Sequence, residues 1–213
     1  KGTYTLVKYA VVKVIYHLER SQLGFKIGYQ PELLKKILAN KTALQFPKDN
    51  ELRLRYAKII HQLILSKTGR ELIEEVVKSR KIIYLADGKQ DQFVTNGRIL
   101  KITMNLLSKR NCQAYSYVKR PDRDEPILEP IPEHIIFAHE LIHAYHAQKG
   151  KLLIDHKPNQ SIYTNLEEEN TIKGVPGLMD FTENMIREDF GFPLRVGHVG
   201  THICDAIDAK RDF

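Results

Sequence analysis

Cysteine is almost absent from this chain: Cys112 and Cys204 are the only two among 213 residues, and neither belongs to a Cys-x-x-Cys pair. A disulfide framework and a thiolate metal site both need several cysteines at short, regular spacings, so the sequence excludes both classes. The scarcity predicts folding in a reducing compartment.

Long apolar runs are also missing, since no segment approaches the roughly 18 residues that span a bilayer. The most apolar stretch near the start, "YTLVKYAVVKVIYHLER", is interrupted by Lys8 and Lys13 and lacks a small-residue cleavage site. It therefore predicts an amphipathic helix over residues 3–20 and no signal peptide. Without repeats or low-complexity tracts, a chain of this length predicts a single domain over residues 1–213.

The net charge of +7 is the balance of many charges of both signs, since the chain has 33 basic and 26 acidic residues. An Arg-rich tract or a basic motif interleaved with aromatics is lacking, which argues against a nucleic acid as partner. No membrane partner is expected either, and an acidic protein surface fits the charge better. We expect a monomer.

Hydrophobic periodicity predicts a helical N-terminal part. A short helix follows Pro31, with an apolar face over residues 33–38, and a longer helix runs from about Glu51 to Ser66, where Gly69 is expected to close it. "RELIEEVVKS" predicts a further helix after that turn.

The period then changes to that of β-structure. "KIIYLAD" predicts a strand that ends in an Asp87-Gly88 turn, and "FVTNGRILKITMN" contains an Asn-Gly pair that predicts a turn before "RILKITMN". "RILKITMN" alternates polar and apolar residues, as expected of a half-exposed strand at a sheet edge.

The rest of the chain is mainly helical. The proline- and charge-rich segment "KRPDRDEPILEPIP" predicts a loop, and a helix should run from Pro132 to a C-terminal Gly150. A last helix, "MDFTENMIREDFG", should end at Gly191. A helical first half, a small sheet and a helical second half make an α+β fold.

The segment "FAHELIHAYHAQKG" carries the clearest chemical signal. His139 and His143 lie four residues apart, so a helix projects both imidazoles from one face, about 6 Å apart at Cβ. That spacing allows both to bind one tetrahedral zinc ion. Glu140 points about 100° away, where it can serve as the general base that takes a proton from a metal-activated water, as in zinc-protease helices.

A structural interpretation competes with this one, because histidines on a buried helix can also serve the core. The apolar neighbours of His139 and His143 predict burial, and buried imidazole nitrogens need partners, which a metal and nearby acceptors would supply. His146 lies two turns from His139, too far to share its ion. Capping by backbone carbonyls at the helix end is the preferred role for His146, with contact to another site residue or to substrate left open.

A catalytic zinc site needs a third protein ligand, commonly a carboxylate. The downstream acidic candidates are Glu167, Glu168, Glu169, Asp180, Glu183, Glu188 and Asp189. Composition alone favours "EEE" as a solvated charge run at a helix start.

The motifs resemble two groups of zinc proteases. "AHELIHAYHAQKG" followed by "EEENTIKG" is similar to the clostridial neurotoxin light chains. The order "HELIHAYHA", "EEENTIKG", "TENMIREDFGFPLR" resembles the NleD-type effector metalloproteases more closely, mostly over the C-terminal half. The resemblance implies a zincin-like metalloprotease fold with Zn²⁺ as cofactor.

Matched onto this chain, the resemblance implies Glu168 as the third ligand, three residues before Thr171. Glu183 is the second choice and Glu169 a distant third. Glu183 is expected instead to orient a zinc-binding histidine or to pair with an arginine such as Arg187.

The resemblance also implies a residue that stabilises the oxyanion formed during peptide hydrolysis. Arg195 is this candidate, with a surface salt bridge as its structural alternative. Where the family often has a tyrosine three residues later, this chain has His198, a possible replacement. "RILKITMN" is a candidate edge strand for pairing with an extended substrate.

The resulting hypothesis is a zinc endopeptidase of the His-Glu-x-x-His class. The resemblance implies a secreted virulence effector, injected by a type III system into the host cell cytoplasm, that cleaves stress-activated MAP kinases of the Jun-kinase group in the activation loop. The alternatives are a non-catalytic helical module that binds an acidic partner, and a zinc hydrolase acting on a non-protein substrate.

Overall fold

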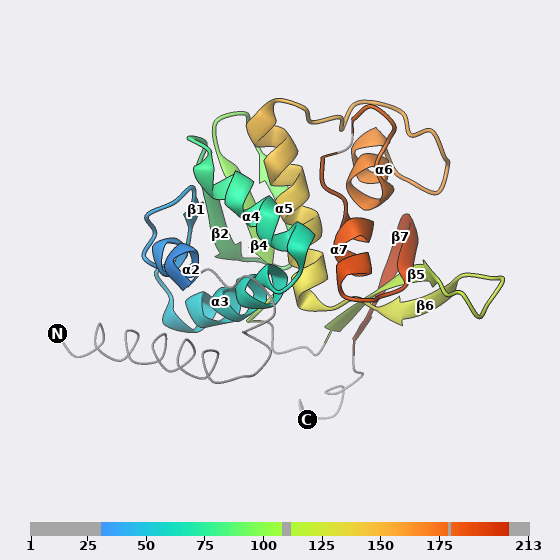
Figure 1. The fold of residues 1–213 in the computed structure, drawn as a ribbon, viewed down its shortest axis with the longest axis horizontal. Coiled ribbons are helices and arrows are strands. Elements are labelled where there is room, and N and C mark those ends of the chain that lie inside the picture. The colour runs from blue at the N-terminus through green and yellow to red at the C-terminus, as the bar shows by residue number, and fades with distance from the viewer. Residues whose placement is uncertain (1–30, 108–111, 179, 205–213) are drawn as a thin grey trace, which may run out of the picture.

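The structure of the chain is a computed structural model that describes residues 31–107, 112–178 and 180–204 (Figure 1). The helix expected over residues 3–20 lies outside these ranges. Six helices and two sheets are described, which confirms the α+β class. No helix in the described ranges is both long and apolar enough to cross a bilayer.

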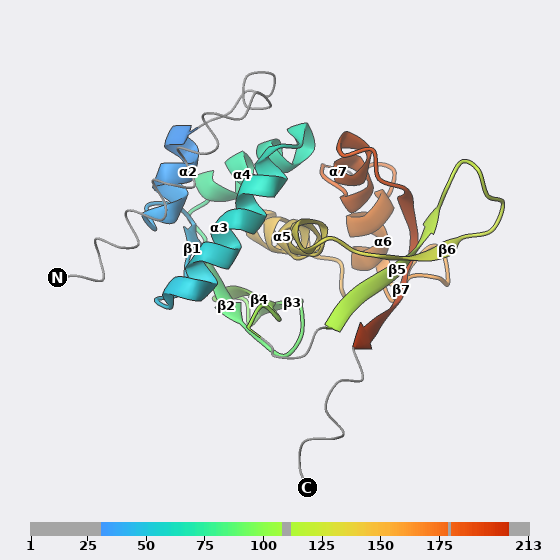
Figure 2. The same cartoon turned by 90° about the horizontal axis from the view of Figure 1, so that it is seen from below.

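The elements fall on two sides of one long helix, α5 (Glu133–Lys149), as Figure 2 shows. On one side lie α2 (Pro31–Leu38), β1 (Leu44–Gln45), α3 (Asn50–Ile64), α4 (Lys67–Lys78), β2 (Ile83–Asp87), β3 (Gln92–Thr95) and β4 (Leu100–Met104). On the other lie β5 (Cys112–Lys119), β6 (Ile127–Pro130), α6 (Leu166–Lys173), α7 (Glu183–Asp189) and β7 (Leu194–Cys204). Helix α5 therefore lies between the two halves and packs against both.

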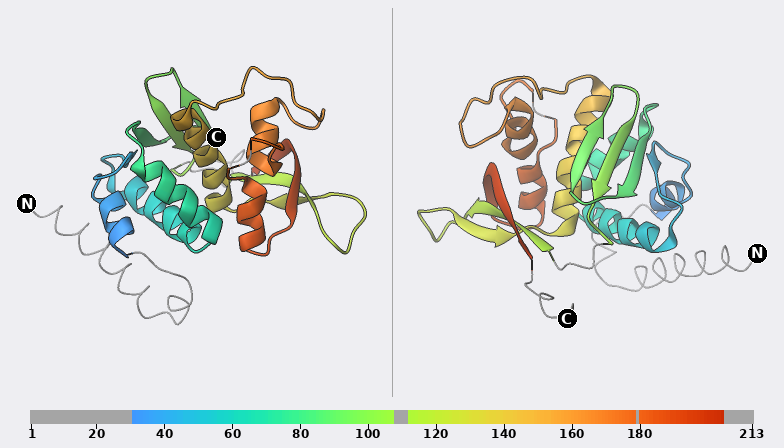
Figure 3. Two further views of the ribbon diagram at one scale, coloured as in Figure 1. Left: turned by 45° about the horizontal axis from the view of Figure 1, so that its top comes forward. Right: turned by 180° about the vertical axis from the view of Figure 1, so that it is seen from behind.

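The first sheet has the strand order β1-β2-β4-β3, with β1, β2 and β4 parallel and β3 antiparallel to β4. Figure 3 (right) shows this sheet beside α5. The predicted edge position of "RILKITMN" is wrong, because β4 lies between β2 and β3. Its alternating pattern arises because Lys101 is exposed while Leu100 and Ile102 are buried, and the true edge strand beside α5 is β3.

The predicted Asn-Gly turn is confirmed, and it joins β3 and β4 as a hairpin. The Asn96 side-chain oxygen accepts hydrogen bonds from the backbone N–H groups of Arg98 and Ile99. Gly97 has φ of 83°, a conformation that a side chain would disfavour, so the Asn-Gly pair fixes this turn.

Buried apolar side chains fill the space between α3, α4, α5 and the first sheet. Tyr56 of α3 is fully buried, stacks edge-on against Phe137 of α5, and donates its hydroxyl hydrogen to the Ala86 carbonyl at 2.8 Å. Because α5 is buried over almost its whole length, its apolar residues surround the two histidines and the glutamate and hold them in place.

The predicted helix boundary at Gly69 is wrong. Helix α3 already ends at Ile64, and Ser66 caps α4 by accepting a hydrogen bond from the Gly69 N–H at 2.8 Å. A Cβ atom on Gly69 would lie 2.4 Å from the Leu63 carbonyl oxygen. Gly69 is required because α3 and α4 approach closely at their junction.

We expect Gly69→Ala to destabilise the chain although alanine favours helix. The new methyl group meets a backbone carbonyl that has little room to move, and such overpacking costs about 1–3 kcal/mol. Urea unfolding followed by circular dichroism measures the change, with Glu71→Ala on the exposed side of α4 as control. A Gly69→Ala chain as stable as this control would contradict the proposed close approach.

The second sheet is antiparallel, with the order β6-β5-β7, and the sequence patterns predicted none of its strands. Residues 127–130, expected in a loop, form β6. Strand pairing also brings the cysteines into register, with Cys112 opposite Cys204, although they are distant in sequence. The scarcity of alternating apolar residues in these strands explains why the patterns missed them.

The start of α5 packs against the end of α7. The His134 ring lies edge-on to Phe190, with 4.8 Å between ring centroids, and its Nε2 atom is buried. Burial and the positive charge of Arg187 lower the pKa of His134 from 6.5 to about 4. His134 is therefore neutral in the folded chain at neutral pH.

This shift predicts a loss of stability in acid. Between pH 6.5 and 4 the unfolded chain binds a proton at His134 that the folded chain does not, so the free energy of unfolding falls with pH by up to about 3 kcal/mol. Urea unfolding at several pH values tests this, because His134→Leu should remove this part of the slope. An identical slope in both chains would disprove it.

Candidate metal centre

Helix α5 presents His139 and His143 side by side, one turn apart. Both are 6% exposed, and their Nε2 atoms lie 3.1 Å from each other. Two nitrogens at this distance face one point in space, as their spacing in the sequence predicts.

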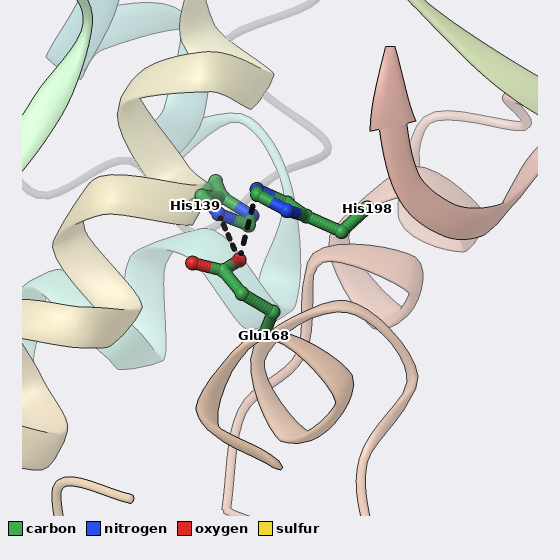
Figure 4. Close-up of side chains that lie close together, drawn as sticks. All are labelled: His139, Glu168 and His198. Atoms are coloured by element: carbon green, nitrogen blue, oxygen red, sulfur yellow. Dashed lines mark ion pairs between the residues drawn. The ribbon is translucent and has the colours of Figure 1, made fainter. Parts of the chain in front are cut away.

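Helix α6 brings Glu168 to the same point. Its Oε2 atom lies 3.1 Å from His139 Nε2, and its Oε1 atom lies 3.4 Å from His143 Nε2. The Asn165 side chain caps α6 by accepting a hydrogen bond from the Glu168 N–H, which fixes the start of the helix. Figure 4 shows Glu168 reaching from α6 toward His139 on α5.

These three side chains fit a zinc ion. Two ligands of a tetrahedral zinc, each about 2.0–2.1 Å from it, lie about 3.3 Å apart. The contacts among His139, His143 and Glu168 are 3.1–3.4 Å. Glu168 Oε2 is buried without a hydrogen bond of normal geometry although imidazole nitrogens adjoin it. A shared cation satisfies such an oxygen, so the residues fit a metal.

The opposite nitrogens of both imidazoles are held by carboxylates. Glu183 of α7 lies 2.9 Å from His139 Nδ1, and Glu167 of α6 lies 2.9 Å from His143 Nδ1. With Nδ1–H donating to a carboxylate, Nε2 is the nitrogen left to bind a metal at the centre in place of a proton. The expectation that Glu183 orients a histidine and pairs with Arg187 is confirmed, with Arg187 Nε donating at 2.7 Å.

The sequence assigned no role to Glu167 beyond its place among the acidic candidates. The interpretation of "EEE" as a solvated charge run is wrong for it, because Glu167 is 1% exposed. Besides His143, it accepts hydrogen bonds from the Thr171 hydroxyl and the Leu153 N–H. The sequence signal for this role is the spacing of Glu167 and Thr171, which lie four residues apart and therefore share one helix face.

The preferred prediction that backbone carbonyls at the end of α5 cap His146 is wrong. Its ring is 1% exposed, and its Nδ1 atom lies 2.7 Å from the Glu167 carboxylate. Glu167 thus joins His146 to His143, which is the contact with another site residue that the sequence left open.

The charges of the site favour a cation. Burial alone raises the pKa of Glu167, but hydrogen bonds to His143 and His146 outweigh it and lower the pKa to about 2. For His143 burial acts in the other direction and lowers the pKa, but hydrogen bonds to Glu167 and Glu168 outweigh it and raise the pKa to about 10. The carboxylates stay ionised, and a positive charge among them is therefore favourable. A divalent ion supplies such a charge.

Glu140 lies on α5 beside the centre, 9% exposed and close to the edge strand β3. Burial raises its pKa, while the adjacent His139 and a hydrogen bond from the Phe93 backbone act in the opposite direction. The Phe93 ring stacks over His143, with 6.4 Å between ring centroids. Strand β3 therefore adjoins both Glu140 and His143.

Arg195, at the start of β7, is 8% exposed and is not a surface residue. Its guanidinium donates to the Glu183 carboxylate at 2.9 Å and to the carbonyl oxygens of Gly197 and His198. These contacts describe a residue that positions others, and the oxyanion role stays a prediction. His198 lies 3.4 Å from Glu168 through its Nε2 atom.

The remaining acidic candidates lie in other contacts. Glu169 is buried and pairs with Lys173 at 2.9 Å, and Asp180 pairs with Lys151 at 3.0 Å. Asp189 accepts a hydrogen bond from the Thr68 N–H at the start of α4. Their known partners leave Glu168 as the carboxylate that faces both α5 imidazoles.

Comparisons with known proteins add nothing to this geometry: no family model, no curated protein and no solved structure matches the chain.

The Glu183 carboxylate predicts a large stability effect. It lies fully buried between Arg187, Arg195 and His139, so Glu183→Ala leaves two buried guanidinium groups without their anion. Breaking such a pair costs about 3–5 kcal/mol. Urea unfolding of metal-free protein measures this, and Glu183→Gln should lose less.

Glu188→Ala, on the exposed face of the same helix, is the matched control. If Glu183→Ala and Glu188→Ala unfold at the same urea concentration, the buried ion pairs do not hold α7 in place.

Proposed function

We propose that the chain is a zinc-dependent endopeptidase. The observation that carries this proposal is the contact of both α5 imidazoles with Glu168: the Nε2 atoms of His139 and His143 lie 3.1 Å apart, and each lies 3.1–3.4 Å from one of the two Glu168 carboxylate oxygens. The carboxylates on the far nitrogens of both imidazoles support it, because they orient both Nε2 atoms toward Glu168.

In this proposal His139, His143 and Glu168 hold the ion, and Glu183 and Glu167 keep the imidazoles in place. A zinc ion held by these residues would supply Lewis-acid chemistry, polarising a water molecule and the carbonyl of the scissile bond. Glu140 takes a proton from the attacking water and passes it to the leaving nitrogen.

The edge strand β3 supports a peptide as substrate. In the described part of the chain, β4 pairs with one side of β3 and no strand pairs with the other. An extended peptide can add to such an edge through backbone hydrogen bonds. Because Phe93 of β3 adjoins Glu140 and His143, a peptide paired there would pass the centre. β3 replaces β4 in the predicted role.

The architecture supports a zincin-like protease. The resemblance implies a small mixed sheet with helices and a His-Glu-x-x-His helix in the C-terminal half, and the chain has both features. The second choice for the third ligand, Glu183, is occupied by His139 Nδ1 and two arginines. Glu168 is therefore the proposed ligand.

The resemblance to NleD-type effectors extends the proposal to substrate and place. It makes the chain a virulence factor of the type III secretion class, acting as a monomer in the host cytoplasm on MAP kinases of the Jun-kinase group. These points stay predictions that rest on the motifs.

Two other functions separate from this one by simple measurements. A non-catalytic module for an acidic partner would bind no zinc and would not respond to changes at Glu140. A zinc hydrolase with a non-protein substrate would bind zinc and leave every protein substrate intact. Both lack the support that the open edge of β3 gives to a peptide substrate.

Glu140→Gln should keep about one zinc per chain and the native stability, yet lower kcat for proteolysis by roughly 10²–10⁴, because the general base is gone. Metal analysis and cleavage of purified stress-activated MAP kinases, followed by gel electrophoresis and mass spectrometry, measure both quantities.

Glu71→Gln, exposed on α4, is the control and should cleave as the wild type does. A metal-free wild-type chain, or full proteolysis by Glu140→Gln, would rule out the proposed function.

A further inference from the structure

A third imidazole faces the centre from a different element. His198 belongs to β7, and its Nε2 atom lies 3.4 Å from Glu168 Oε2. Ligand atoms of His139, Glu168 and His198 all lie within 4.8 Å of one another. The rings of His139 and His198 are nearly parallel, with an angle of 10° between them, and Figure 4 shows both adjoining the Glu168 carboxylate.

The far nitrogen of His198 is held in the same way as those of the α5 histidines. Its Nδ1 atom lies 2.6 Å from the Thr164 hydroxyl oxygen, just as Glu183 and Glu167 hold Nδ1 of His139 and His143. With Nδ1–H donating to Thr164, the lone pair is on Nε2 and points toward Glu168.

The backbone of His198 is fixed as well. Its N–H donates to the Ile162 carbonyl at 3.0 Å, and its own carbonyl accepts from Arg195 at 3.0 Å. The preceding Gly197 has φ of 151°, and a Cβ there would lie 3.2 Å from the Ile162 carbonyl oxygen. Glycine thus permits the close approach that brings this histidine to the centre.

We propose that His198 is a fourth protein ligand of the metal in the substrate-free chain, binding through Nε2. This inference rests on the proposed zinc centre and adds a residue to it. A distance of 3.4 Å between Nε2 and the Glu168 oxygen matches the spacing of about 3.3 Å between tetrahedral ligands.

Four protein ligands make a closed site, whereas catalysis needs an open position. His198 is the ligand suited to leave, because its side chain is 36% exposed, against 8% for each α5 histidine and 16% for Glu168. Its departure, on the arrival of substrate along β3, would open the position that water and the scissile carbonyl require.

The test compares His198→Ala with the wild type and with His156→Ala, an exposed histidine in the loop after α5. Competition with a chromophoric chelator gives the dissociation constant for zinc, and the visible spectrum of the Co²⁺-loaded chain reports the ligands. We expect His198→Ala to bind zinc at least about tenfold more weakly, with shifted cobalt bands, because water replaces an imidazole. His156→Ala should match the wild type.

Thr164→Val removes only the hydroxyl that contacts His198 Nδ1, so it should also weaken zinc binding, but by less. This second variant keeps the test valid if His198→Ala does not fold. Unchanged zinc affinity and cobalt spectra in the folded His198 and Thr164 variants would overturn the inference and leave the zinc centre intact. A wild-type chain without zinc affinity would overturn the centre itself.

Discussion

The hydrogen bond between an imidazole Nδ1 and an oxygen acceptor is the interaction on which the rest of the site depends. It occurs at Nδ1 of His139 with Glu183, of His143 with Glu167 and of His198 with Thr164. The two carboxylates can only accept, so they keep a proton on Nδ1, and all three contacts orient the rings so that each Nε2 faces the Glu168 carboxylate. The acceptors come from α6, α7 and the loop before α6, so the positions of these elements around α5 determine where the acceptors lie.

Buried charge ties these elements together. Glu183 lies between Arg187 of its own helix and Arg195 of β7, while its second oxygen contacts His139 on α5. A carboxylate so enclosed is acceptable only because every oxygen has a cationic or hydrogen-bonded partner. Arg195 continues the network into the backbone at His198. The same contacts therefore stabilise the C-terminal half and position two of its imidazoles.

The apolar half has a different task. Packing of α3, α4 and the first sheet against α5 holds that helix rigid, and the close contact at Gly69 shows how tightly α3 and α4 meet. The hairpin at Asn96 and Gly97 places β3 beside the same helix with one edge unpaired. In the proposed function, a helix between an open strand and a group of carboxylates would hold an extended peptide over the metal.

Local sequence determined the elements whose rules act over a few residues. The four-residue spacing of His139 and His143 fixed their common helix face, the Asn96-Gly97 pair fixed the hairpin, and Gly150 ended α5, because helix period, turn type and cap depend on neighbours alone. Tertiary structure decided the rest. It moved β4 from the edge to the interior, buried Glu167, joined His146 to it, and brought β7 with His198 to the centre. These outcomes depend on contacts between distant segments, which no local pattern encodes.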